Sequence, residues 1–300
     1  MRTAFGQIVT VSEIGLSNEK SVHELYQLSE NESITEGAGD KRKRLFIGID
    51  IQYDFMETGA LPVPNSHKDV ENTTRFIFNH INKISKIAVS LDTHRLNQIF
   101  HPSWWVDNEG RHPAPLTVIT SQEVREQKWK AVYHPIESLS YLNLLEENSN
   151  KNLCIWPYHC IEGTRGASLE GQFSNMIHFH SFVRKTDIIK IVKGKNPLSE
   201  MYGIFKQEDG KVENDDFLQG IQEYDEIIIA GQAKSHCVFE SIRQLVEHYC
   251  TDRDVTGKIV VLEDCMSSIP GFEEETAKSL QHFSETYGIQ LVKSTEYQMK

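Results

Sequence analysis

The chain has 300 residues, 39% of them apolar, and a net charge of 31 − 43 = −12. An acidic chain is a poor candidate for binding nucleic acid or anionic membranes, and no apolar run reaches the roughly 20 residues of a membrane span. The first residues lack an apolar signal-peptide core, and five irregularly spaced cysteines do not predict a disulfide framework. We therefore expect a cytoplasmic protein that binds neither nucleic acid nor membrane.

Residues 1–44 are predicted to be an N-terminal extension, followed by one folded domain at 45–300. Residues 8–11 are all β-branched, which is typical of a short strand. Residues 29–44 are polar and are expected to form a partly ordered surface arm.

Apolar runs alternate with helix-periodic segments from residue 45 onward. Strands are expected at 45–50, 87–91, 187–192, 226–230, 258–262 and 289–292, and helices at 68–83, 168–180, 273–286 and from 237 onward. This alternation predicts an α/β fold of three layers, α/β/α, with a central, mainly parallel sheet of about six strands. Residues 95–152 are too many for a plain connection and are predicted to be an insertion covering the active site.

Cys237 lies where a buried apolar strand gives way to a helix. A helix N-terminus carries partial positive charge, which lowers the pKa of a thiol and makes it a better nucleophile. The alternative is that Cys237 is a small buried core residue, which is the commoner fate of a lone cysteine.

Polar side chains follow three further strands. Asp50 ends the first of them, where it either takes part in chemistry at the carboxyl edge of the sheet or caps a turn. Asp92 and His94 are two residues apart on extended chain, so they face the same side and suit a divalent cation. His159, in an irregular loop, is a further candidate ligand, and Lys193 directly follows the third of these strands, 187–192.

Together these motifs resemble the isochorismatase-like cysteine hydrolase superfamily, most closely its nicotinamidase branch. The matching stretches are Asp50-Ile-Gln-Tyr-Asp-Phe55, Asp92-Thr-His94, Trp156-Pro-Tyr-His-Cys160, Gly163-Thr-Arg-Gly166, Lys193-Gly194 and Gly231-Gln-Ala-Lys-Ser-His-Cys237. The resemblance covers roughly residues 45–295 and implies the family's Rossmann-like three-layer fold.

The resemblance also implies a mechanism, in which Cys237 attacks the carbonyl of a small carboxamide, nicotinamide first, and forms a thioester. Asp50 would accept the thiol proton and pass it to the leaving amine, and Lys193 would hold Asp50. A cis peptide at Gln232–Ala233 is expected, and the N–H groups of Ala233 and Cys237 would form the oxyanion hole.

In the nicotinamidase branch, the positions of Asp92, His94 and His159 hold one divalent metal. A set of nitrogen and oxygen ligands suits Zn²⁺ best, with Mn²⁺ or Fe²⁺ as alternatives. His101 is the rival to His159, because it lies near Asp92 in the sequence.

The resemblance further places Phe55 and Trp156 against the substrate ring, and ordinary core packing is their alternative role. Three features depart from the family pattern, namely the extension, the long insertion and the run 201–205, which lacks the family's Tyr-Ser pair. They leave open an amidase for another small amide. A metal-free vinyl-ether hydrolase like isochorismatase and a non-enzymatic scaffold also remain open, and a homo-oligomer is expected.

Overall fold

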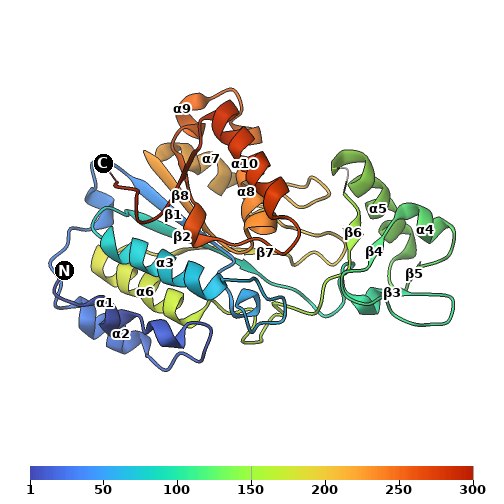
Figure 1. Cartoon of the computed structure of the whole chain (residues 1–300), viewed down its shortest axis with the longest axis horizontal. Helices are drawn as coiled ribbons and strands as arrows, with labels where there is room; N and C mark the ends of the chain where they lie inside the picture. The colour runs from blue at the N-terminus through green and yellow to red at the C-terminus, as the bar shows by residue number, and fades with distance from the viewer. Residues whose placement is uncertain (150, 300) are drawn as a thin grey trace.

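In the computed structural model, which describes residues 1–149 and 151–299, a parallel sheet of six strands forms the centre of the molecule (Figure 1). Its strands are β1 (Arg44–Ile49), β2 (Lys86–Asp92), β7 (Ile189–Lys193), β8 (Glu226–Gly231), β9 (Ile259–Leu262) and β10 (Gln290–Val292). All five neighbouring pairs run parallel, in the order β10-β9-β8-β1-β2-β7. The predicted fold class is confirmed, because each of the six strands expected from residue 45 onward is present.

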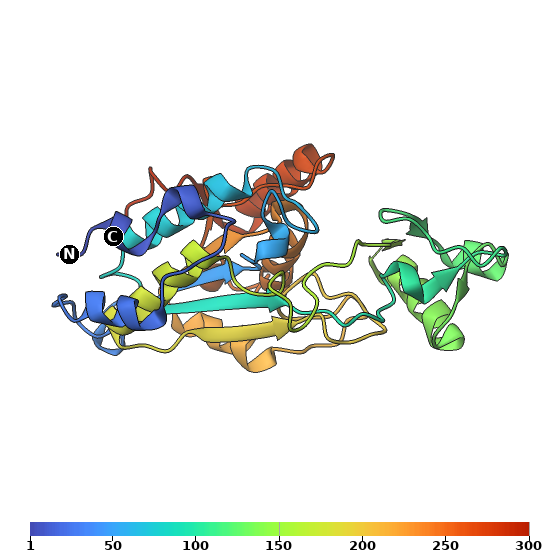
Figure 2. The same cartoon turned by 90° about the horizontal axis from the view of Figure 1, so that it is seen from below.

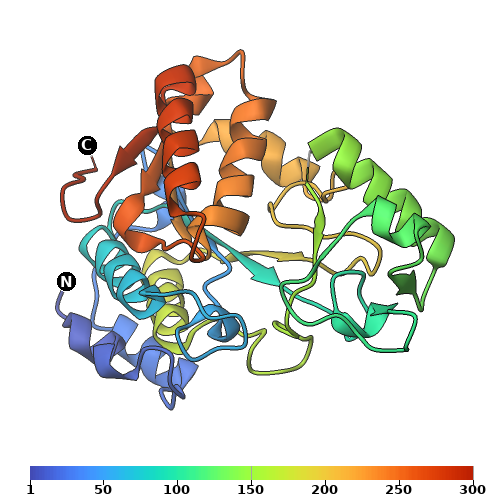
Figure 3. The same ribbon diagram turned by 45° about the vertical axis from the view of Figure 1, so that its right-hand side comes forward.

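Helices cover both faces of this sheet, as Figure 3 shows. One face carries α3 (Ser66–Asn79) and α6 (Gly171–Arg184), and the other carries α7 (Asp215–Gly220), α8 (Phe239–His248), α9 (Arg253–Thr256) and α10 (Glu273–Tyr287). Neighbouring strand residues point to opposite faces, so Phe46 joins the core on the α3 side and Ile47 the core on the α8 side. Burial on both faces explains why β1, β8 and β9 are nearly continuous apolar runs, whereas the edge strands β7 and β10 have exposed residues.

The strand order reverses at the centre of the sheet. The chain first builds outward through β1, β2 and β7, then returns to the other side of β1 and continues through β8, β9 and β10. Connections that leave a sheet in opposite directions open a crevice beyond the carboxyl ends of the two strands at the reversal. Asp50 directly follows β1, and Cys237 lies shortly after β8.

The N-terminal segment lies against α6 and contains α1 (Phe5–Ile8) and α2 (Val22–Ser29). The expectation of a strand at residues 8–11 is wrong, because Ile8 ends a helix and no sheet edge lies beside it. Ile8 and Leu25 are buried in the apolar cluster that also contains residues of α3 and α6. In the expected arm at 29–44, Arg184 of α6 donates to the Thr35 carbonyl oxygen and pairs with Asp40. The segment is therefore packed against the domain, while its boundary at residue 44 stays a prediction.

Most of residues 95–152 form a lobe that projects beyond the carboxyl edge of the sheet (Figure 2). It contains α4 (Ser121–Arg125), α5 (Pro135–Ser149) and the short strand pairs β3 (Trp105–Val106) with β5 (Lys130–Ala131) and β4 (Val118–Ile119) with β6 (Leu153–Cys154). The lobe has its own apolar core, built around Trp104 and Trp105. That these residues are an insertion stays a prediction.

Two further observations concern membrane-spanning helices and disulfide bonds. Within the two described ranges, no helix is both long enough and apolar enough to cross a membrane. The five cysteines are all unpaired, and three of them are buried.

Candidate active site

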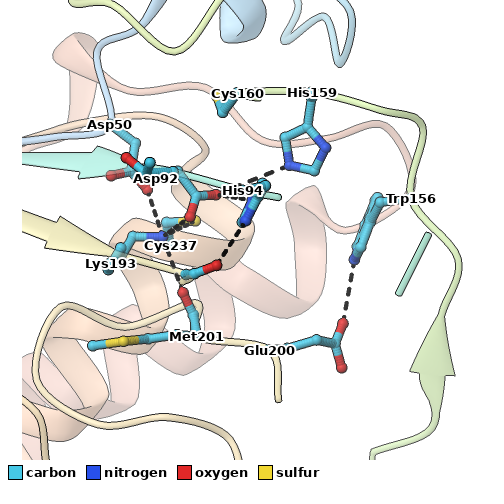
Figure 4. Close-up of polar contacts among 12 residues, drawn as sticks. Asp50, Asp92, His94, Trp156, His159, Cys160, Lys193, Glu200, Met201 and Cys237 are labelled. Carbon is cyan, nitrogen blue, oxygen red and sulfur yellow. Dashed lines mark hydrogen bonds and ion pairs between the residues drawn. The ribbon is translucent and has the colours of Figure 1, made fainter. Parts of the chain in front are cut away.

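Four strand ends bring polar side chains together at one edge of the sheet (Figure 4). Asp50 follows β1, Asp92 ends β2 and Lys193 ends β7. Cys237 lies in a π-helical turn, Lys234–Val238, that connects β8 to α8. Because β7, β2, β1 and β8 are neighbours in this order, the sheet itself sets the spacing between the four side chains.

The ammonium group of Lys193 is the centre of the cluster. Its Nζ lies 2.9 Å from Asp50 Oδ2 and 3.1 Å from Asp92 Oδ1, and it donates a hydrogen bond of 3.0 Å to the carbonyl oxygen of Met201. The sulfur of Cys237 is 3.6 Å away. One buried cation therefore contacts two carboxylates and the thiol.

Lys195, the second lysine of this segment, lies outside the cluster. Its side chain is 49% exposed and pairs with Glu162 at 3.3 Å. Gly194 separates the two lysines and has a φ of 78°, a conformation that suits glycine. A Cβ at this position would come within 2.7 Å of both Asp92 and His94, so only glycine allows the chain to pass so close to the site.

Burial controls the protonation of the cluster. It raises the pKa of Asp50, and the charge of Asp92 adds to this rise, while Lys193 opposes it. Burial alone would lower the pKa of Lys193, but the two carboxylates outweigh it and raise that pKa well above its usual range. Lys193 therefore stays charged, and Asp50 is a carboxylate with increased affinity for a proton.

The thiol of Cys237 differs from the prediction based on a helix N-terminus. Burial raises its pKa well above the usual range, and Asp50 and Asp92 raise it further, although Lys193 opposes them. The resting thiol is therefore protonated in the described cluster, and a base is needed to activate it. The sulfur and carboxylate oxygens of Asp50 and Asp92 all lie within 4.8 Å of one another.

Two buried polar side chains that the sequence analysis missed hold Asp50 and Asp92, the first through its carboxylate and backbone and the second through its backbone alone. Ser90 donates from Oγ to Asp50 Oδ1 at 2.6 Å and accepts the Asp50 N–H at 3.0 Å. Gln52 donates from Nε2 to the Asp92 carbonyl oxygen at 2.8 Å and accepts the Asp92 N–H at 2.7 Å. A serine inside the apolar run 87–91 was the available signal for the first of them.

Asp92, His94 and His159 form a set of donor atoms suited to a metal. The Nδ1–H of His94 donates to the Gly194 carbonyl oxygen at 3.1 Å, and that of His159 to the Pro157 carbonyl oxygen at 2.8 Å. Each Nε2 then presents a lone pair, and these atoms lie 3.0 and 3.9 Å from Asp92 Oδ2. Three acceptor atoms that converge in this way fit a divalent cation.

Backbone hydrogen bonds fix the loop that carries His159. Asp54 Oδ2 accepts the N–H of Cys160 at 2.7 Å, and the Asp54 N–H donates to the carbonyl oxygen of Gly166 at 3.2 Å. His94 donates its N–H to the Cys160 carbonyl oxygen at 2.9 Å and accepts that of Glu162 at 2.8 Å. The loop is thereby tied to the end of β2, which carries the other two donors.

His101 is buried nearby but lies outside this donor set. Its ring centroid is 6.1 Å from that of His94, whereas the ring centroid of His159 is 4.8 Å away. Its Nδ1–H donates to the Leu96 carbonyl oxygen at 3.1 Å. The geometry thus favours His159 over His101 as the third ligand.

A pocket of about 450 Å³, open to solvent, lies beside the cluster. Its aromatic lining includes the predicted Phe55 and Trp156, and also Phe100, Tyr202 and His236, which the sequence analysis did not assign. Cys237 lines the same pocket, together with Asp92, His94 and His159. Ala233 lines it as well, and the peptide bond between Gln232 and Ala233 is cis. The aromatic lining of the pocket suits a flat ring.

Comparisons with known proteins give both fold and sequence relatives. A nicotinamidase of Escherichia coli strain K12 is 27% identical over 198 residues, which is 65% of this chain and 72% of that protein. Solved structures with this fold include a nicotinamidase/pyrazinamidase of Acinetobacter baumannii, with a TM-score of 0.58, 17% identity, and coverage of 86% of this chain and 99% of that one. A pyrazinamidase of Pyrococcus horikoshii in complex with zinc has a TM-score of 0.51, 20% identity, and coverage of 84% and 99%. No protein-family model matches the chain.

Proposed function

We propose that the chain is a member of the isochorismatase-like cysteine hydrolase superfamily and that it hydrolyses a small carboxamide, with nicotinamide as the first choice. The observation that supports this most directly is the position of Lys193. Its ammonium group contacts Asp50, Asp92 and the sulfur of Cys237, so the nucleophile, its base and a metal-binding carboxylate meet at one atom. A cytoplasmic location and assembly into a homo-oligomer belong to the same proposal.

The first half of the reaction would form a thioester. Asp50 takes the proton from the Cys237 thiol, and the sulfur attacks the amide carbon. The raised pKa of Asp50 helps this transfer, and Lys193 limits the charge left behind. Asp50 then gives the proton to the amide nitrogen, the C–N bond breaks, and ammonia leaves.

The second half would return the free thiol. A water molecule loses a proton to Asp50 and attacks the thioester carbon, which releases the carboxylic acid and the thiolate. The thiolate regains the proton from Asp50. In both halves the negative oxygen of the tetrahedral intermediate would accept hydrogen bonds from the N–H groups of Ala233 and Cys237.

Asp92, His94 and His159 would hold one divalent metal, and Zn²⁺ is the ion best suited to two imidazoles and a carboxylate. When bound, such an ion supplies a Lewis acid that can hold a ring nitrogen of the substrate. Phe55 and Trp156 would contact the faces of that ring and direct its amide group toward Cys237.

We expect one divalent metal per chain, and we expect His159→Ala to lower metal affinity by at least about 100-fold, because it removes one of three donors. The matched variant His101→Ala removes a buried histidine outside the donor set and should keep most of the metal. Elemental analysis and titration with a chelator measure both, and circular dichroism checks the fold. Full metal content in His159→Ala together with its loss in His101→Ala would assign the third ligand to His101.

The proposed function is tested by ammonia release from a panel of amides. Nicotinamide and pyrazinamide should be hydrolysed, and benzamide, which has the same shape without a ring nitrogen, should be hydrolysed at least about tenfold more slowly. A chelator should reduce the difference between nicotinamide and benzamide. Release of pyruvate from isochorismate without ammonia from any amide would instead favour the vinyl-ether hydrolase.

A further inference from the structure

A buried carboxyl group that the proposed mechanism does not use lies in the wall of the catalytic pocket. Glu200 belongs to the segment after β7, and it is only 3% exposed. A carboxyl group is costly to bury unless hydrogen-bond donors surround it. Burial raises the pKa of Glu200 to about 7.

Three side chains hold this carboxyl group, and each comes from a different part of the chain. Tyr202 donates from its hydroxyl to Oε1 at 2.5 Å. Trp156 donates from Nε1 to the same oxygen at 3.3 Å (Figure 4). Tyr141 donates from its hydroxyl to Oε2 at 3.2 Å, and it accepts the backbone N–H of Glu200 at 3.0 Å. Tyr141 is therefore bonded to Glu200 twice.

Of these three partners of Glu200, two line the pocket and one does not. Trp156 and Tyr202 line it, and they are also joined directly, because Trp156 Nε1 lies 3.0 Å from the Tyr202 hydroxyl. Tyr141 does not line the pocket and lies on α5 of the projecting lobe. Glu200 thus connects a helix of the lobe to two rings of the pocket wall.

The wall formed by these rings has space on both sides. Trp156, Glu200 and Tyr202 line the catalytic pocket and also a neighbouring groove. Packing holds these rings in part, because Trp156 belongs to the apolar core of the lobe and both rings contact His236. Their hydrogen bonds to Glu200 set the orientation that this packing leaves open.

We propose that Glu200 is a positioning residue through which Tyr141 of helix α5 sets the orientation of Trp156 and Tyr202, and thereby the selectivity of the pocket for a ring-bearing amide. The effect on selectivity for a ring-bearing amide rests on the proposed function. The effect of Tyr141 and Glu200 on the orientation of the two rings does not depend on that function. The projecting lobe accordingly has a role in selecting the substrate, and the reacting groups are unaffected.

Two substitutions test the connection, and a third is their control. Tyr141→Phe removes one hydroxyl and leaves the ring and the pocket lining in place. Glu200→Gln keeps an acceptor oxygen for Tyr202 but removes the charge. Tyr133→Phe removes a hydroxyl from the same lobe at a ring that packs on Trp104, away from Glu200.

The first measurement needs no substrate. The indole N–H signals of the four tryptophans are recorded by ¹⁵N–¹H NMR, and the signal of Trp156 is identified by its loss in Trp156→Phe. Both Tyr141→Phe and Glu200→Gln should shift the Trp156 signal, whereas Tyr133→Phe should not. An unshifted signal in Tyr141→Phe would overturn the proposal, whether or not the protein hydrolyses any amide.

The second measurement uses the best substrate of the amide panel and a small amide without a ring. Tyr141→Phe should raise KM for the ring-bearing amide by about tenfold, leave kcat within about threefold, and change the KM of the small amide little. Loss of binding in Glu200→Gln alone, with Tyr141→Phe unchanged, would mean that Glu200 contacts the substrate itself, contrary to the proposal. If the parent protein releases no ammonia at all, the proposed function fails, and the NMR result alone decides the role of Glu200.

Discussion

Replacing Cys237 with alanine should abolish amide hydrolysis and leave the fold intact. The sulfur lies within 4.8 Å of the Asp50 carboxylate and 3.6 Å from the Lys193 ammonium, and no other cysteine joins these two groups in the described part of the chain. Without the thiol there is no thioester, so we expect a loss of at least about 10³-fold in kcat. The change removes one buried atom and should cost little stability.

The matched control for this variant is Cys265→Ala, because Cys265 is also fully buried but does not line the pocket. It should keep its activity. Steady-state ammonia release and thermal unfolding are measured for both variants. Turnover near the parent rate in Cys237→Ala, with the fold intact, would exclude Cys237 as the nucleophile.

Lys193→Ala should lower kcat by orders of magnitude, whereas Lys195→Ala should stay within about tenfold of the parent. Lys193 is the group that lowers the pKa of Asp50, so without it Asp50 holds its proton more tightly and cannot accept another from the thiol. Two buried carboxylates also lose their cation, which we expect to cost about 3–5 kcal/mol of folding free energy. Lys195 pairs with Glu162 at the surface, so its removal should change neither quantity.

The two effects of Lys193→Ala are separated by measuring kcat on the folded fraction and the free energy of unfolding in urea. A variant that unfolds more easily but turns over normally would limit Lys193 to a structural role. Greater loss in Lys195→Ala than in Lys193→Ala would assign the catalytic lysine to position 195.

The strand ends could be predicted from the sequence because a parallel strand buried on both faces is a short apolar run, and its end is visible as the first polar residue. Asp50 stands at such an end, and Asp92 does so beside His94. Lys193 ends the edge strand β7, in which exposed and buried residues alternate. The carboxyl ends of neighbouring parallel strands share one edge, so these residues were expected to meet. The close approach of the chain at Gly194 follows from the same arrangement.

The hydrogen bonds that orient the buried polar side chains of the pocket and its wall leave no comparable pattern along the sequence. Ser90 and Asp50 are 40 residues apart, and Tyr141 and Glu200 are 59 residues apart, so each pair forms only when the fold brings distant segments together. The pKa of Cys237 was mispredicted for a related reason. Its position after a strand indicated a helix N-terminus, whereas burial and two carboxylates from other strands decide its protonation.

The place of β1 in the sheet has a consequence for the chain during its synthesis. β1 pairs with β2 on one side and with β8 on the other, and Arg44 and Glu226, which pair at the start of this second contact, are 182 residues apart. At roughly 5–20 residues per second, the ribosome needs about ten to forty seconds to make that length. During this time one edge of an apolar central strand has no partner, which is the condition under which nascent chains associate with one another. A chain that ends before residue 226 would keep this edge open permanently, so truncated products should be aggregation-prone and require chaperones even though they contain Asp50, Asp92 and Lys193.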